Sequence, residues 1–213
     1  MSKILIGIPT MQYVAQQFLG STLAMNYDHN QYCYDIKANS LVYIARNEIA
    51  VDAIGGGFDW LVFLDSDMVL EPDTVSKLVH DAREFDHDFV TGLYFKRKLP
   101  TEPLILKHLG WTVDDNGIAK SEAEVYTDYP KNKMVEIAGS GMGCCIIKVD
   151  TLHKVANAFR CGPFDPMQQL SEDYAFCWRM RQYRRKLWCD TSIKAGHAGT
   201  YVYTEEDYER GDK

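Results

Sequence analysis

Two aspartates directly follow a run of five apolar residues in the stretch WLVFLDSDM, residues 60–68. The run Trp60–Leu64 has the length and composition of a buried strand, and Asp65 and Asp67 come immediately after it. Alternate side chains of extended backbone point to one side, so we expect these two carboxylates to lie together. Their mutual repulsion is relieved by a divalent cation. The spacing therefore predicts a site for Mn²⁺ or Mg²⁺, hard cations that usually hold phosphates.

A second Asp-x-Asp, Asp86-His87-Asp88, is an internal comparison. It falls between an expected helix and the start of the next strand. In an open parallel sheet, ligands bind beyond the carboxyl ends of strands, so this pair is predicted to be a solvated turn. For Asp65 and Asp67 the position fits a site, although a simple capping turn at a strand end is the structural alternative.

Two acids also begin an expected helix in the stretch SEDYAFCWRMR, residues 171–181. Glu172 and Asp173 fall in its first turn, where the helix dipole favours carboxylates. Stabilisation of the helix is therefore one sufficient reason for their presence. The catalytic alternative is that one carboxylate, kept ionised by the helix start, accepts a proton from a substrate hydroxyl.

Three further features could complete a site. His197 lies between small residues and could join a manganese shell, although most lone histidines are structural. Arg46 precedes the Asp-Ser-Asp strand and could neutralise Asp65 or reach a phosphate, if it is not simply a surface arginine. The glycine cluster 139–143 could admit a substrate to the backbone or form a tight turn. Lys96–Lys98 could guide an anionic group toward the site.

The elements that must position these residues alternate between strand and helix. In the first half we expect a strand Lys3–Ile8, a helix within 11–25, a weak strand 32–36, a helix 41–54 capped by Ser40, the strand 60–64, a helix opening at 72–74 and a strand 89–93. This alternation implies right-handed crossovers and a largely parallel sheet.

The second half is less periodic. Residues 97–135 are polar and turn-rich, with a hairpin turn expected at 114–117. Strands 135–138, 144–149 and 186–190, a short helix from Asp150 or Thr151 and a helix capped by Ser171 should follow. The tail 204–213 is expected to be too charged to pack and could lead into a further domain.

Composition narrows the class of protein. The 213 residues are 46% hydrophobic, enough for one domain with a core, and the net charge of -7 argues against nucleic-acid binding. No apolar run approaches the length of a membrane span, and residues 1–9 are too short for a signal peptide. Six cysteines without a Cys-x-x-Cys pair favour free thiols, which predicts a cytoplasmic protein.

The order of these motifs resembles the GT-A glycosyltransferases, in particular the small family-2 branch. The order is Ile-Pro-Thr after the first strand, Ala-Arg-Asn on a helix, Asp-Ser-Asp, the glycine turn, Glu-Asp and a late His-x-Gly, spanning residues 4–201. The sequence is also similar to N-terminal domains of glycosyltransferases encoded by large chlorella viruses, which implies a viral protein in the host cytoplasm. The resemblance implies one α/β GT-A domain over 1–203, with a central mostly parallel sheet, flanking helices and a small antiparallel addition. Residues 1–95 would form its donor half and 96–203 its acceptor half.

The same resemblance implies a metal-dependent transfer from a UDP-sugar to a hydroxyl of a glycan or glycoprotein, with inversion or retention left open. Its implied residues are Asp173 and Glu172 at the reacting groups; Pro9, Thr10, Asp35, Arg46, Asp65, Ser66, Gly139 and Ser140 at the donor; and Asp67, His197 and Asp65 at Mn²⁺ or Mg²⁺. Two departures stand out. The second strand lacks a clear acidic end, and 107–113 has no familiar counterpart.

Other activities are weighed against these motifs. A haloacid-dehalogenase-type phosphatase would use Asp65 as its nucleophile, but its motif usually lies on the first strand. A nucleotidyltransferase would prefer a glycine-rich basic loop where residues 8–14 read IPTMQYV. A sugar-binding module without catalysis would not need all the acids and His197 together. Glycosyl transfer is the favoured hypothesis.

Overall fold

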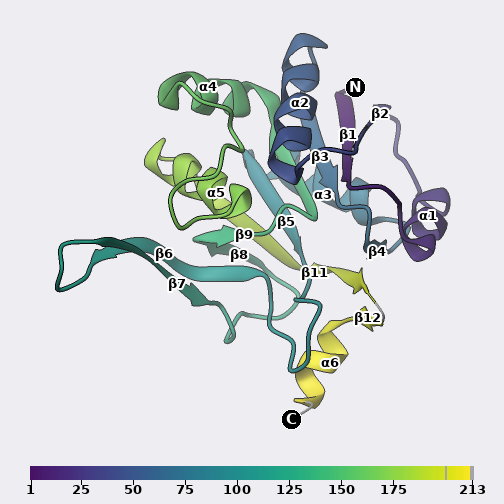
Figure 1. Ribbon diagram of the computed structural model, residues 1–213. Coiled ribbons are helices and arrows are strands. Elements are labelled where there is room, and N and C mark those ends of the chain that lie inside the picture. Colours follow the sequence, from purple (N-terminus) through teal and green to yellow (C-terminus); the bar gives the residue numbers. More distant parts are fainter. Residues whose placement is uncertain (200, 212–213) are drawn as a thin grey trace.

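The computed structural model describes residues 1–199 and 201–211 (Figure 1). Helices and strands alternate through the first half, as the sequence predicts. The first-half elements are β1 (Lys3–Thr10), α1 (Gln16–Leu23), β2 (Gln31–Ala38), α2 (Val42–Gly55), β3 (Trp60–Leu64), β4 (Met68–Leu70), α3 (Thr74–Glu84) and β5 (Phe89–Leu93). The others are β6 (Ile105–Val113), β7 (Ala119–Val125), β8 (Met134–Ile137), β9 (Gly139–Ser140), β10 (Cys144–Lys148), α4 (Val149–Phe159), α5 (Glu172–Gln182), β11 (Leu187–Ala198), β12 (Val202–Tyr203) and α6 (Glu205–Arg210).

The central sheet has nine strands within the described residues, in the order β12-β11-β5-β10-β3-β1-β2, with β4 and β8 paired to β11. β1 runs parallel to β2 and β3, and β11 runs parallel to β5. Only β10 runs against both of its neighbours, β3 and β5, in the middle of this order. Cys144, where β10 begins, therefore pairs with Leu64, where β3 ends, and the glycine cluster enters at the carboxyl edge of the parallel strands.

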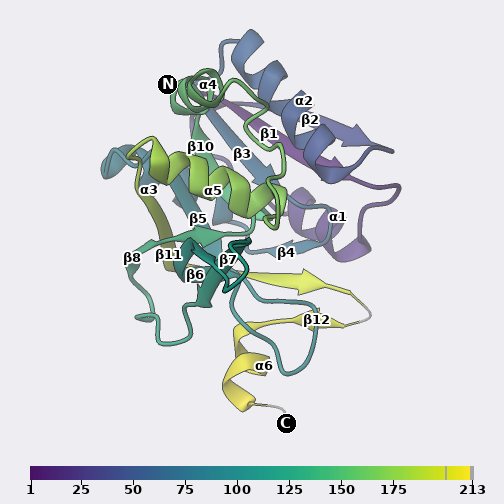
Figure 2. The ribbon, with the colours of Figure 1, turned by 60° about the vertical axis from the view of Figure 1, so that its left-hand side comes forward.

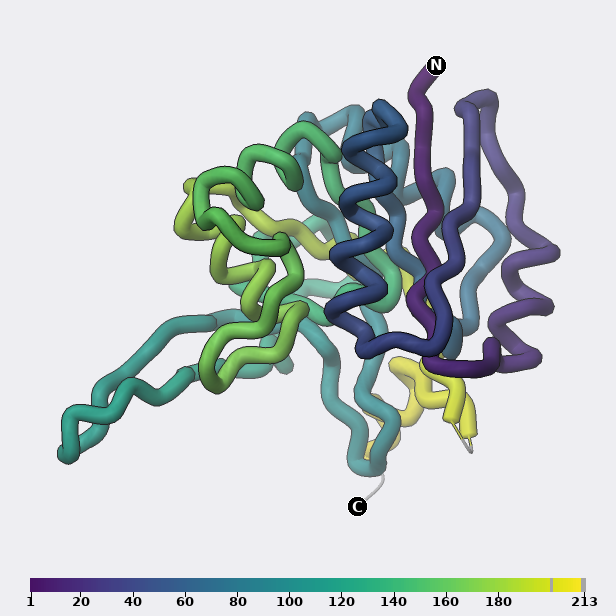
Figure 3. The backbone as a smooth tube through the Cα atoms, turned by 45° about the horizontal axis from the view of Figure 1, so that its top comes forward, coloured from purple at the N-terminus to yellow at the C-terminus, as the bar shows by residue number. Residues whose placement is uncertain are grey.

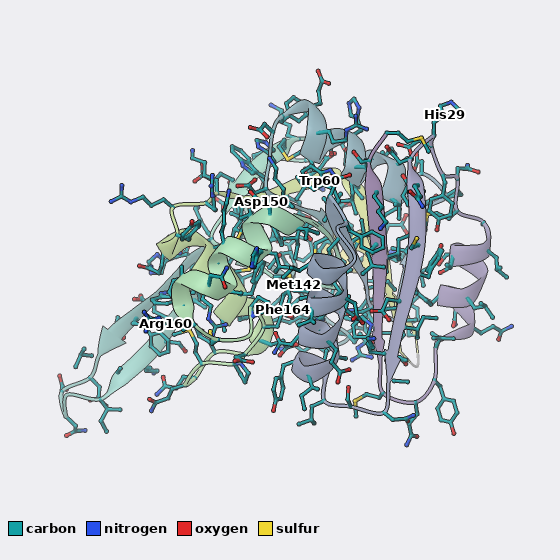
Figure 4. The ribbon with its side chains drawn as sticks, turned by 90° about the horizontal axis from the view of Figure 1, so that it is seen from above. His29, Trp60, Met142, Asp150, Arg160 and Phe164 are labelled. Atoms are coloured by element: carbon teal, nitrogen blue, oxygen red, sulfur yellow. The ribbon has the colours of Figure 1, made fainter. Side chains whose placement is uncertain are left out.

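Alternation along the strands divides the core into two layers. One layer joins Leu61 and Phe63 to the inner faces of α2, α4 and α5, and the other joins Val62 and Leu64 to α1 and α3. Figure 2 shows α5 crossing in front of the sheet. Seen from above, Met142 and Phe164 lie in the interior, and both are fully buried (Figure 4). The predicted α/β architecture, with helices flanking a mostly parallel sheet, is confirmed.

The small antiparallel addition is a second sheet with the order β7-β6-β9. Its hairpin β6–β7 extends away from the body of the molecule (Figure 3). The hairpin turn predicted at 114–117 is confirmed: Gly117 N donates to Asp114 O over 2.9 Å, and Ile118 N donates to Asp114 Oδ1 over 2.8 Å. The two long strands were missed, because most of their residues are exposed or half-buried and show no alternation.

Two local expectations are wrong. Ser40 does not cap α2, because the N-cap residue is Leu41. Leu41 itself is exposed, whereas Arg46 and Ile49 are buried. The tail also packs as far as it is described. α6 buries Glu205 and Asp207, with Asp207 closing a capping box on Thr204. Among the described residues, no helix has the length and hydrophobicity needed to cross a bilayer.

Candidate functional site

A cleft opens at the carboxyl edge of the sheet, where β1 and β3 end and α2 begins. The cleft is lined by Pro9, Thr10, Met11, Ser40, Val42, Ala45, Asp65, Ser66, Asp67 and Arg97. Six of these were expected at the site: Pro9, Thr10, Asp65, Ser66 and Asp67, together with Arg97 from the basic stretch Lys96–Lys98. The side of the cleft formed by Ser40 and the first turns of α2 was missed. The residue types at a helix start do not show whether that helix start faces a ligand or solvent.

Strand register places Asp67 beside His197. After β3 the chain turns tightly, with Met68 N donating to Asp65 O over 3.0 Å. β4 then pairs antiparallel with β11, so that Met68 lies opposite His197. The backbone N–H of Ala198 donates to Asp67 O over 2.7 Å. Two segments far apart in the sequence are thus joined by backbone hydrogen bonds at this point.

His197 is held in one tautomer. Its Nδ1 lies 2.8 Å from the carbonyl oxygen of Phe95, which can only accept, so Nδ1 carries the proton. In the neutral imidazole the lone pair of Nε2 then faces Asp67 Oδ1 at 3.6 Å, and in the protonated imidazole Nε2 presents an N–H to this carboxylate instead. Metal-binding histidines are commonly fixed by such a bond to a carbonyl oxygen.

Asp67 also contacts Arg97, whose Nη1 lies 2.7 Å from Asp67 Oδ2. Burial favours the protonated form of Asp67, but the neighbouring His197 and the charge of Arg97 outweigh it and lower the pKa of Asp67. Within the described residues no group of three or more His, Cys, Asp or Glu side chains is arranged around a common point. An imidazole nitrogen and an ionised carboxylate nevertheless suit Mn²⁺, and ligand oxygens and water would supply its remaining positions.

Behind the cleft, Arg46 is buried among three carboxylates. Its Nη2 lies 3.0 Å from Asp65 Oδ1 and 3.1 Å from Asp65 Oδ2, and its Nε lies 3.5 Å from Asp173 Oδ1 and 3.8 Å from Glu172 Oε1. Arg46 is 1% exposed and does not line the cleft. Of the roles considered for it, the structure shows neutralisation of Asp65.

The acidic start of α5 behaves differently from the expectation. Burial, opposed by Arg46 and reinforced by Glu172 and Asp65, raises the pKa of Asp173 to about 8. Burial thus acts against the expected effect of the helix start, which would lower the pKa of Asp173. The helix dipole is outweighed because one guanidinium faces three acids in surroundings of low polarity.

The glycine cluster holds Tyr94, which the sequence reading missed. The Gly143 N–H donates to the Tyr94 hydroxyl over 2.9 Å, and Tyr94 is 3% exposed. A Cβ at Gly141 would overlap that hydroxyl and lie 3.2 Å from the ring carbon Cζ. Gly139 and Ser140 are buried in β9 beside Cys177 and do not line this cleft, so their expected donor contact stays a prediction.

Asp35 lies outside the cleft lining as well. It pairs with Lys37 at 3.2 Å, and burial raises the pKa of its carboxyl. The comparison pair 86–88 lies before β5, at the opposite end of the sheet from Asp65. Asp88 pairs there with Arg185 at 3.3 Å, whereas the side chain of Asp86 is 89% exposed. The predicted difference between the two Asp-x-Asp sequences is confirmed in position.

The sequence matches one protein-family model, described as glycosyl transferase family 2, over residues 24–153. The matched segment runs from the end of α1 into α4 and includes Asp65, Asp67 and the glycine cluster. No curated protein matches the chain.

Two solved structures share its fold. A197 from STIV superposes with a TM-score of 0.64 at 18% identity, covering 95% of this chain and 93% of that one. GalNAc-T7, solved with UDP, GalNAc and Mn²⁺, superposes with a TM-score of 0.57 at 10% identity. That alignment covers 99% of this chain and 47% of GalNAc-T7.

Proposed function

This chain belongs to glycosyl transferase family 2, and from that premise we propose that it moves a sugar from a UDP-sugar to a hydroxyl of a glycan or glycoprotein, with Mn²⁺ or Mg²⁺ as cofactor. The observation that carries the proposal is the pairing of Asp67, which lines the cleft, with a tautomer-fixed His197. GalNAc-T7, which has this fold, was solved with UDP and Mn²⁺.

The donor nucleoside would occupy the cleft between the end of β1 and the start of α2. Pro9 and Thr10 would line its nucleoside end, and Asp65 and Ser66 would lie near the ribose. Ser40 adds a polar group there, since its buried Oγ has no hydrogen-bond partner within the protein. Residues 96–203 would then supply the acceptor side.

Asp67 and His197 would hold the metal together with the donor diphosphate, and Asp65 would join from the ribose side. When bound, the cation supplies positive charge that stabilises the departing diphosphate. Arg97, which already contacts Asp67 at 2.7 Å, can turn toward the same phosphates because its side chain is half-exposed.

Asp173 is assigned as general base if the product is inverted. The acceptor oxygen then forms a bond to the anomeric carbon, the bond from that carbon to the phosphate oxygen breaks with its electron pair leaving on UDP, and Asp173 takes the hydroxyl proton. If the acceptor instead attacks from the leaving-group side, Asp173 and Glu172 stabilise the cationic sugar and configuration is retained.

A phosphatase with Asp65 as nucleophile is the alternative activity. Both oxygens of Asp65 contact Arg46, which reduces the nucleophilicity of the carboxylate. Family membership and this pairing together favour glycosyl transfer.

The proposal is tested by thermal shift with a panel of nucleotide-sugars, each with and without Mn²⁺. UDP and one or more UDP-sugars should stabilise the wild type only when metal is present. Asp67→Ala should abolish this stabilisation, and the exposed Asp86→Ala should keep it. Equal stabilisation of Asp67→Ala and wild type would remove the metal role, and stabilisation by no nucleotide would remove the UDP-sugar donor.

A further inference from the structure

Arg46 contacts acids from three separate segments. It projects from α2 toward Asp65, which follows β3, and toward Glu172 and Asp173 at the start of α5. Asp65 belongs to the proposed donor side, and Asp173 is the proposed base. Both sides therefore meet on one buried guanidinium, packed with its Cζ 5.2 Å from the centre of the Phe63 ring.

The contacts of this guanidinium are unequal. Nη2 bonds to Asp65 at hydrogen-bond distance, whereas Nε faces Asp173 Oδ1 at 3.5 Å and Glu172 Oε1 at 3.8 Å. Nε and Nη1 are buried without hydrogen-bond partners, and so is Asp173 Oδ1. An unpartnered donor and an unpartnered acceptor thus face each other, and a small approach of α5 would join them.

We propose that Arg46 is a positioning residue that ties the donor-side carboxylate Asp65 to the acceptor-side base Asp173. The inference rests on the proposed function and extends it. Arg46 fixes where the Asp173 carboxylate lies and makes its ionised form attainable, so that the base is available on the same scaffold that places the donor.

The charges around Asp173 support this role. The titratable groups that face it are Glu172, Tyr174 and Cys177 from α5, Asp65 after β3, Tyr94 after β5 and Cys145 in β10. Each of these is neutral or negative, and Arg46 is the cation that acts on Asp173. A neutral residue at position 46 would leave the carboxylates without that counter-charge, and Asp173 would keep its proton to higher pH.

Lysine and glutamine at position 46 separate charge from geometry. Arg46→Lys keeps the charge, but one ammonium lacks the planar fork that reaches Asp65 and Asp173 at once. Arg46→Gln removes the charge and keeps a planar hydrogen-bonding group. The first substitution should lower kcat by about 10-fold or more without moving the pH profile. The second should move the acid limb of kcat/KM for the acceptor upward by about one pH unit or more.

The test records transfer rates from pH 6 to 10 for both variants, together with calorimetric titration of UDP and Mn²⁺. A carboxyl-carbon NMR titration of Asp173 in the metal-free protein gives a readout that does not need turnover. If Arg46→Gln does not fold, Arg46→Gln/Asp65→Asn is compared with Asp65→Asn by the same NMR titration. Coincident Asp173 titrations with and without Arg46 would overturn the proposal. A wild type that transfers no sugar would overturn the proposed function instead, leaving the NMR test intact.

Discussion

The geometry of His197 depends on one hydrogen bond to a backbone carbonyl. Because Phe95 O accepts from Nδ1, the neutral imidazole carries its lone pair on Nε2, which faces Asp67. An imidazole fixed in this way binds a cation without first reorganising, which favours tight binding.

Substituting His197 should therefore weaken metal binding selectively. His197→Ala is expected to lower Mn²⁺ affinity by about 10-fold or more in calorimetry at saturating UDP. The matched control is His80→Ala, because His80 is an exposed histidine on α3. An unchanged Mn²⁺ titration for His197→Ala would make His197 a structural residue only.

Asp173→Asn should trade activity for stability. Transfer should fall by about 10²–10⁴-fold, because Asn cannot take the acceptor proton, while UDP binding with metal changes little. In the wild type the transfer rate should rise with pH toward a plateau above about 8, where Asp173 is ionised. Equal loss of transfer and of UDP binding in Asp173→Asn would mean that Asp173 only supports α5.

The raised pKa of Asp173 also predicts how the stability of the folded protein changes with pH. Folding raises the Asp173 pKa from 3.8 to about 8, so the folded state binds more protons and wild-type stability falls as pH rises through that window. Asn escapes this cost. Its melting temperature should match wild type near pH 4 and exceed it by about 2 °C or more at pH 8, as scanning calorimetry would show.

At the scale of elements, the turn that joins β9 to β10 packs against the Tyr94 hydroxyl, which accepts from Gly143 N. Gly141→Ala should destabilise the fold by about 1–3 kcal/mol, because the added methyl group would overlap the buried Tyr94 hydroxyl. Tyr94→Phe should partly rescue it in a double-mutant cycle read by urea unfolding. The control is Gly55→Ala, where the methyl group meets no atom within 4 Å. Additive effects of Gly141→Ala and Tyr94→Phe would contradict the steric account.

Most elements of the first half could be predicted from the sequence, since β3 is a continuous apolar run, β5 is a short stretch rich in apolar residues and α3 carries a regular apolar stripe. The hairpin β6–β7 could not, because strands that are solvated over most of their length lack alternation. The burial of Arg46 on α2 could not be predicted either. Arg46 occupies a core position there, and only acids from distant segments make that burial tolerable.

At the scale of the whole molecule, α6 packs against the residue whose backbone carbonyl orients His197. Tyr208 of α6 packs on Phe95 with ring centres 5.5 Å apart, and its hydroxyl donates to Thr127 O over 2.9 Å. Glu205 accepts from the Tyr129 hydroxyl and pairs with Lys194. α6 is thereby connected to the backbone group that orients His197.

Tyr208→Ala should consequently affect more than stability. We expect a loss of about 1–3 kcal/mol in unfolding free energy and a several-fold weaker Mn²⁺ affinity, because Phe95 loses its packing partner. Arg210→Ala, an exposed change on the same helix, is the control. A destabilised Tyr208→Ala with wild-type Mn²⁺ affinity would show that α6 does not reach the site.

The site as a whole was predictable where strand ends and residue order define it. Asp65, Asp67 and Pro9 follow from strands that end at one edge, and their approach to one another is confirmed. Ser40, Tyr94 and the approach of Glu172 and Asp173 to Arg46 could not be predicted, because three-dimensional neighbours from unrelated segments leave no spacing signal. The glycan or glycoprotein acceptor, the cytoplasmic location and the viral origin stay predictions.

The pairing of β4 with β11 has a consequence for synthesis on the ribosome. Asp67 leaves the exit tunnel long before His197, and the two side chains cannot face each other until β11 has docked beside β4. A nascent chain halted before β11 would carry the aspartates without the imidazole. Binding of one cation by both residues would therefore require that β11 has been translated and has paired with β4.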